Sequence, residues 1–149
     1  MLKFIQGFSI FKNFSTEHKA CLFRLLEEKN YNKGDLIIKE GDHEKSLFLL
    51  HTGVARIMKL TDDGEYAEIA YVSSGEYFGE LSLIDDKPRF ASVEAFDTCK
   101  AFQLTKLAYT ELCRKYPEAE VCMLKGFLHD LVVKLRDTSE TMINKRLFI

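Results

Sequence analysis

The 149-residue sequence has no apolar run of the roughly 18 or more residues that a membrane-spanning helix needs. It also lacks a basic excess: 21 Lys and Arg stand against 23 Asp and Glu, which disfavours a dedicated nucleic-acid binder. The start, 1–7, has neither a sustained apolar stretch nor a small-residue cleavage site, so we expect no signal peptide. With 46% hydrophobic residues, 1–149 is expected to form a single globular domain.

Cysteine and histidine are few and scattered. The four cysteines show no CxxC spacing, and the four histidines form no HxH or HExxH motif. We therefore expect neither a disulfide framework nor a metal centre, and reduced thiols favour a cytoplasmic protein. No Ser/His/Asp or Cys/His arrangement stands out, so the chain is not expected to be an enzyme.

Two kinds of hydrophobic spacing, helical and β-like, alternate over three segments of the chain. Ser15 is the expected N-cap of a helix that fades over 27–30, which makes 1–30 a helical segment. Glycines then separate short β-rich runs, a pattern typical of a sandwich, jelly roll or barrel. These runs are 36–38, 47–50, 54–58, 67–72, 91–96 and 99–104. Helical spacing returns over 106–149, with one helix at 106–115 and a second that Pro117 starts.

The apolar residues of the last helix fall at heptad spacing, interrupted at Thr138 and Lys145. They are Val121, Leu124, Leu128, Leu131, Leu135, Met142 and Ile149. Met123, Phe127 and Val132 widen this stripe, so part of the helix is expected to pack on its own domain. The helix continues past the rest of the domain, which indicates a homodimer formed through it.

The segment 78–93 carries the chemistry. Gly79 opens a short helical turn, and a loop then delivers Arg89 to the start of a strand. The N–H groups at the start of a helical turn and a guanidinium both suit an anion. Glu80 would repel that anion unless it faced a hydroxyl, so the natural ligand contains a phosphate and a sugar.

This segment resembles the phosphate-binding cassette of cyclic nucleotide-binding domains, found in catabolite activator-type regulators, protein kinase A regulatory subunits and gated channels. The glycine-punctuated runs 33–42 and 47–54 are similar to the barrel of that family, and 134–140 to the dimerisation helix of the activator type. The resemblance implies a mainly β fold. An eight-stranded jelly-roll barrel would occupy 31–105, with its cassette at 78–92, between an N-terminal helix and a C-terminal helix pair at 106–149.

The resemblance also assigns a ligand-binding set. Its members are Gly79, Glu80, Leu81, Arg89, Phe90, Ala91, Thr138 and Ser139. By this resemblance Glu80 accepts from the ribose 2′-OH, Arg89 pairs with the cyclic phosphate, and N–H groups of the turn complete the cradle. The small Ala91 lets the strand backbone approach the phosphate, and Thr138 and Ser139 match the helix pair that contacts adenine.

Phe90 departs from the family pattern, which has Ala, Ser or Thr after the arginine. It lacks the hydroxyl that assists the phosphate, or the guanine in cGMP binders, so cAMP is favoured over cGMP. Its ring either stacks on a purine, a contact worth about 1–3 kcal/mol, or fills the pocket.

Two functions stay open from the sequence. The first is a sensor in which a cyclic nucleotide orders the cassette and the last helix relays binding. The second is a nucleotide-independent dimerisation or interaction module, which Phe90 supports. On this interpretation Glu80 and Arg89 pair with each other as a structural ion pair, to which Asp85 or Asp86 contributes. In activator-type proteins a DNA-binding helix-turn-helix follows the last helix. Few residues follow Glu140 here, so we expect no nucleic-acid binding through this chain, which is either a stand-alone sensor or a piece of a larger regulator.

Overall fold

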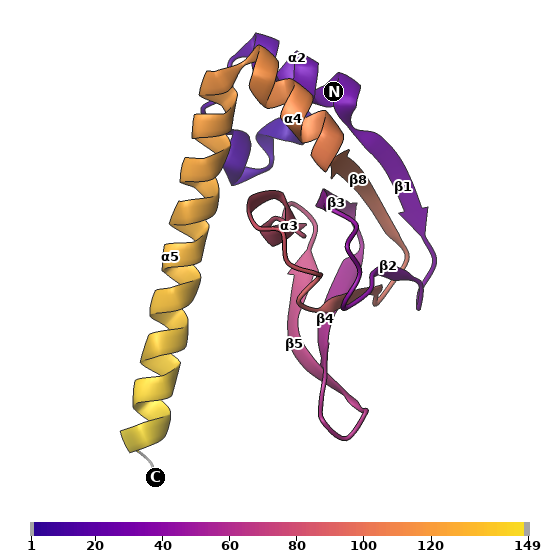
Figure 1. Cartoon of the computed structure of the whole chain (residues 1–149), viewed down its shortest axis with the longest axis vertical. Helices are drawn as coiled ribbons and strands as arrows, with labels where there is room; N and C mark the ends of the chain where they lie inside the picture. The colour runs from indigo at the N-terminus through magenta and orange to yellow at the C-terminus, as the bar shows by residue number, and fades with distance from the viewer. Residues whose placement is uncertain (1, 148–149) are drawn as a thin grey trace.

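Two antiparallel four-stranded sheets form the body of the molecule, with helices at both ends of the chain (Figure 1). The computed structural model describes residues 2–147, and their side chains over 3–139. The strand orders are β1-β8-β3-β6 and β2-β7-β4-β5. The strands are β1 (Glu27–Tyr31), β2 (Leu36–Ile38), β3 (Ser46–Thr52), β4 (Val54–Leu60), β5 (Tyr66–Ser73), β6 (Tyr77–Phe78), β7 (Ser92–Ala95) and β8 (Cys99–Thr105). The helices are α1 (Leu2–Gln6), η1 (Ser9–Phe11), α2 (Thr16–Leu25), α3 (Leu81–Ile84), α4 (Lys106–Lys115) and α5 (Pro117–Leu147). The expected mainly β fold with terminal helices is confirmed, whereas closure into a barrel stays a prediction.

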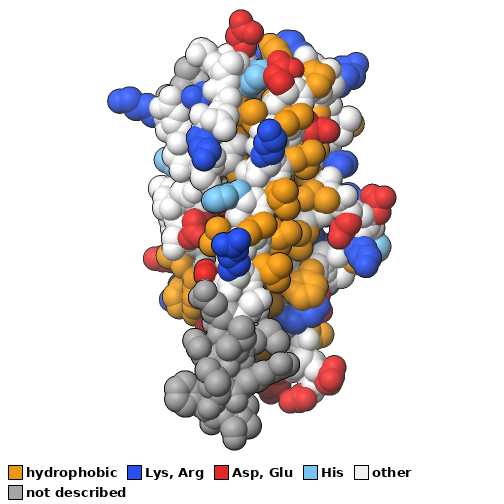
Figure 2. Space-filling model, turned by 90° about the vertical axis from the view of Figure 1, so that its left-hand side faces the viewer, with side chains coloured by type: hydrophobic (Ala, Val, Ile, Leu, Met, Phe, Trp, Pro, Cys, Tyr) orange, Lys and Arg blue, Asp and Glu red, His pale blue; other side chains and the backbone are white. Residues whose placement is uncertain are grey.

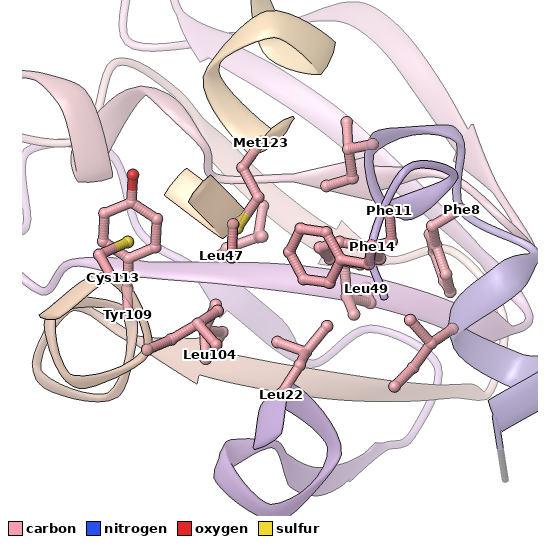
Figure 3. Close-up of a cluster of buried hydrophobic side chains, with 14 of the residues drawn as sticks. Phe8, Phe11, Phe14, Leu22, Leu47, Leu49, Leu104, Tyr109, Cys113 and Met123 are labelled. Carbon is pink, nitrogen blue, oxygen red and sulfur yellow. The ribbon is translucent and has the colours of Figure 1, made fainter. Parts of the chain in front are cut away.

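Strand β3 is buried on both faces because it separates two hydrophobic cores. Leu47 and Leu49 face the helices, where they pack with side chains of η1, α2, α4 and α5 (Figure 3). Phe48 and Leu50 point the opposite way, into the core between the two sheets. Side chains alternate along a strand, so a continuous apolar run is what such a strand requires.

Helix α2 has Ser15 as its N-cap, as the sequence predicts. The Ser15 Oγ accepts from the His18 backbone N–H at 3.1 Å, and the His18 ring accepts from the Ser15 N–H at 3.2 Å. Histidine thus takes the part that glutamate usually has in a capping box. The other ring nitrogen, Nε2, lies 3.0 Å from a Glu118 carboxylate oxygen, so this helix start is tied to the beginning of α5.

The expectation of a helical segment up to residue 30 is wrong over 27–30. Leu26 is extended, with φ −75° and ψ 140°, and β1 begins at Glu27. Strand β1 pairs antiparallel with β8, and Lys100 on β8 lies 3.5 Å from Glu28. The polar composition of this segment does not predict a strand; pairing with a distant strand decides it.

Among the side chains that the structure describes, those of α5 that are buried in the domain lie in the first half of the helix. Met123 and Phe127 are buried, as predicted, but Val132 is 40% exposed, and all side chains over 131–139 are exposed. The predicted stripe positions Met142, Lys145 and Ile149 lie outside the described side chains. Within the described residues, no helix is long and apolar enough to cross a membrane.

Candidate ligand-binding site

A cavity of about 420 Å³ lies between β5, the cassette and α5, which is a size that suits a small organic ligand. Its walls are mostly apolar, with Ile57 and Val93 among them. Six of the predicted ligand-binding residues line it: Gly79, Glu80, Leu81, Arg89, Phe90 and Ala91. The structure therefore brings the cassette together around one cavity, and Glu80, Arg89 and Lys134 place both signs of charge on its wall.

Gly79 has a backbone conformation and a setting that only glycine satisfies. Its φ is +86°, and a Cβ there would lie 2.7 Å from the Ser46 carbonyl oxygen and 3.0 Å from Arg89 Nη1. The chain turns at this residue from β6 into α3, and the absent side chain leaves the room that the guanidinium occupies. The glycine is thus required by the arginine as much as by the turn.

Arg89 is buried, with its side chain 5% exposed, and its two terminal nitrogens are engaged in four hydrogen bonds. Nη1 donates to the Gly79 carbonyl at 3.0 Å and to Ser82 Oγ at 2.8 Å. Nη2 donates to the Ser46 carbonyl and to Glu44 Oε2, each at 2.9 Å. The fifth donor, Nε, is buried without a hydrogen-bond partner. A buried donor without a partner is costly, so Nε is the one nitrogen of this guanidinium whose hydrogen-bonding capacity the described fold leaves unused.

Glu80 is the N-cap residue of α3, yet its side chain caps nothing. Over residues 3–139 its carboxylate forms no hydrogen bond or ion pair, although it is half-buried and lines the cavity. The structural ion pair that the sequence left open, between Glu80 and Arg89, is not formed. The arginine pairs instead with Glu44, and Asp86 pairs with Lys45 at 2.6 Å.

Tyr77, like Glu80, Leu81 and Lys134, lines both this cavity and a second, smaller groove of about 260 Å³. Its hydroxyl donates to Asp130 on α5, and its ring lies 5.4 Å from the ring of Phe127. Burial, and then the hydrogen bond to the Asp130 carboxylate, raise the pKa of Tyr77, so the phenol stays a donor. This contact joins the strand that leads into the cassette to the last helix.

Phe90 does not fill the cavity. The residue is 64% exposed at the rim, and Lys59 Nζ lies 4.2 Å from the centroid of its ring. The alternative in which this side chain occludes the pocket is therefore wrong for this structure.

Thr138 and Ser139 are exposed and do not line the cavity. The Thr138 hydroxyl donates back to the Lys134 carbonyl at 2.9 Å. Within the single chain α5 reaches the cavity at Lys134, one helical turn earlier. Within one chain, Thr138 and Ser139, the two predicted adenine contacts, therefore do not lie at the cavity.

Comparisons with known proteins agree with this geometry. The profile of the family described as "Cyclic nucleotide-binding domain" matches residues 28–116. The chain belongs to this family. A cAMP-dependent protein kinase regulatory subunit of Debaryomyces hansenii is 32% identical over 109 residues, covering 73% of the chain and 23% of that protein. The mouse cGMP-dependent protein kinase 2 is 32% identical over 130 residues, covering 81% of the chain and 17% of that protein. The solved cyclic nucleotide-binding domain from Methylobacillus flagellatus superposes with a TM-score of 0.83 at 26% identity, covering 97% of the chain and 81% of that domain.

The cyclic nucleotide-binding domain thus identified spans less than a quarter of the two kinase-related proteins that it matches. The matched region, 28–116, contains the whole cassette and ends at the residue before α5 begins. Several residues around the site were not predicted from the sequence. Ser82, three residues after Gly79 in the same turn, is one that the spacing could have revealed. Glu44, Ser46 and Lys134 approach from distant segments and carry no signal in the sequence.

Proposed function

We propose that the chain is a cytoplasmic sensor domain that binds cAMP in the cavity beside α3 and relays binding through α5. Arg89 and Glu80 support this proposal because each has hydrogen-bonding capacity that the fold does not use. Arg89 is committed to the fold but keeps Nε free, and Glu80 has no structural partner among the described residues. The single observation that carries the proposal is this free carboxylate, which lines the same cavity as a buried guanidinium.

The phosphate is expected to lie at the start of α3, against the turn amides and Arg89 Nε. The first N–H groups of any helix lack intrahelical partners and carry the positive end of its dipole. Ala91, buried and on the cavity wall, keeps the strand backbone open to a close approach. The ribose then reaches Glu80, whose carboxylate accepts from the 2′-OH.

The purine is expected to lie along the apolar wall, toward β5. Ile57, Ile69 and Val72 belong to this wall, and Phe90 stands at its rim. Phe90 carries no hydroxyl for the 2-amino group of guanine, which favours cAMP over cGMP. The second function that the sequence left open, a module that has lost its ligand, predicts no binding of either nucleotide.

Calorimetric titration of the purified chain with cAMP and cGMP tests the ligand. Glu80→Ala is the informative variant because it removes a ligand contact without breaking a bond within the described structure. Glu111→Ala, an exposed glutamate on α4, is the matched control.

A second nucleotide sharpens this test. Wild type should bind cAMP more tightly than 2′-deoxy-cAMP, whereas Glu80→Ala should bind the two equally, since the lost hydroxyl and the lost carboxylate are one interaction. A charge-assisted hydrogen bond of about 1.5–3 kcal/mol corresponds to a roughly 10- to 150-fold preference. Absence of binding of both cAMP and cGMP by wild type would exclude the sensor function in favour of the ligand-free module.

We also propose that the chain forms a homodimer through α5. Leu124, Leu128 and Leu131 are 40%, 60% and 55% exposed at heptad spacing, and Figure 2 shows hydrophobic side chains gathered on this face. Leu128→Lys should yield monomers in sedimentation velocity, whereas Lys125→Ala, next to this stripe, should leave the dimer intact. A monomeric wild type would contradict the dimer and leave the ligand proposal standing.

A further inference from the structure

The apolar ring of Phe90 lies exposed at the rim of the cavity, although burial would stabilise it. Phe90 is 64% exposed although an apolar cavity begins beside it, and both Ile57 and Val93 lie on the cavity wall. An exposed phenyl ring next to unfilled apolar space is stabilised by turning inward, because that removes apolar surface from water. A contact that holds the ring at the rim opposes this gain.

Lys59 on β4 makes that contact in two ways. Its Nζ lies 4.2 Å from the centroid of the Phe90 ring, within the range of a cation–π interaction, and it donates to the Phe90 carbonyl at 2.7 Å. Lys59 is in turn held by Glu40, at 3.6 Å, and Glu40 also accepts from the Leu60 N–H at 3.0 Å. The ammonium is thus fixed over the ring by the backbone and by a carboxylate.

We propose that Lys59 is a positioning residue that holds Phe90 at the rim and so keeps the nucleotide cavity open. This inference rests on the proposed function for its ligand, but the state of the ring is a property of the chain alone. When Lys59 is absent, Phe90 turns into the cavity for part of the time. The apparent affinity for the ligand is then the intrinsic affinity multiplied by the fraction of molecules in which the cavity is open.

The ligand-independent test observes the ring directly. With Phe ring protons and Ile methyl groups labelled for NMR, Lys59→Met should give new contacts between the Phe90 ring and the Ile57 methyl groups. Lys59→Arg, which keeps the cation over the ring, should retain the wild-type pattern. Lys100→Met removes a strand lysine that is paired with Glu28 and should also retain it. Absence of new ring contacts in Lys59→Met overturns the proposal, whether or not a nucleotide binds.

The ligand test is a double-mutant cycle with cAMP. Lys59→Met should weaken binding by about 2- to 5-fold, the factor that corresponds to a cation–π contact at an exposed site. In the Phe90→Ala background the same Lys59 substitution should have no effect, because no ring remains to enter the cavity. If Lys59→Met weakens binding equally in both backgrounds, the lysine acts through its charge and the positioning role is excluded. If wild type binds no cyclic nucleotide, the proposed function fails while the NMR result still decides the role of Lys59.

Discussion

Removal of Arg89 is expected to destabilise the fold before any ligand is considered. Alanine at this position takes one donor from the buried Ser46 carbonyl and one from Ser82, while the Gly79 carbonyl keeps the Ser82 hydroxyl at 2.9 Å. Glu44, whose side chain is 50% exposed, regains water. Orphaned buried acceptors cost about 1–3 kcal/mol each, and relief of the guanidinium's desolvation offsets part of that loss. We therefore expect a loss of about 3 kcal/mol in the free energy of unfolding.

Urea unfolding followed by circular dichroism measures this loss, without nucleotide present. For a chain of this size, about 3 kcal/mol corresponds to a drop of roughly 6 to 12 °C in Tm. Arg114→Ala, an exposed arginine on α4, is the control and should stay within about 0.5 kcal/mol of wild type. If Arg89→Ala stays within that same range, the buried network contributes nothing to the fold and the reasoning is refuted.

Three further perturbations have defined outcomes. Gly126→Ala places a Cβ 3.0 Å from the Ile10 Cα, and this clash outweighs the gain in helix propensity. Urea unfolding should show a net loss of about 1 kcal/mol in the free energy of unfolding. An increase in that free energy contradicts the close packing of α5 on η1. Tyr77→Phe removes only the bond to Asp130, so hydrogen exchange in the second half of α5 should speed up while β3 is unchanged; equal rates in α5 contradict the coupling. Burial raises the pKa of the Cys113 thiol from 9.0 to about 12, so the thiol ionises first in the unfolded chain and stability should fall as the pH rises between these values. Cys113→Ala should flatten that part of the urea-measured pH profile, and an unchanged slope contradicts it.

Elements set by local chemistry could be predicted closely. Helix α4 spans Lys106–Lys115 as its spacing indicates, and α5 starts at Pro117, where the ring fixes a helical φ and no amide is lost. The two strands that escaped prediction, β1 and β6, lack that local signal. Strand β6 has two residues, Tyr77 and Phe78, and is a strand only because it pairs with Leu49 and Phe48.

The site likewise contains residues that are close in sequence, which could be predicted, and residues from distant segments, which could not. Glu80 and Arg89 lie in one contiguous cassette, so their types and spacing were enough to predict that they share a cavity. Glu44 lies just before β3 and Ser46 is the first residue of β3, more than 40 residues before Arg89. Only the pairing of the strands brings them to the guanidinium. The exposure of Phe90 could not be predicted from the sequence either, because Lys59, which lies against its ring, belongs to the distant strand β4.

Arg89 and Glu80 differ in how well each distinguishes a nucleotide-binding member of the family from a ligand-free one. Arg89 connects the cassette to Glu44 and Ser46, so a domain that had lost its ligand would still need the arginine for its fold. Its presence therefore does not separate a sensor from a ligand-free module. Glu80 makes no hydrogen bond or ion pair within the part of the chain that the structure describes, and a half-buried carboxylate without a partner costs stability. A chain that kept the glutamate gains nothing from it in the unliganded fold, so the glutamate is the residue that favours a bound sugar.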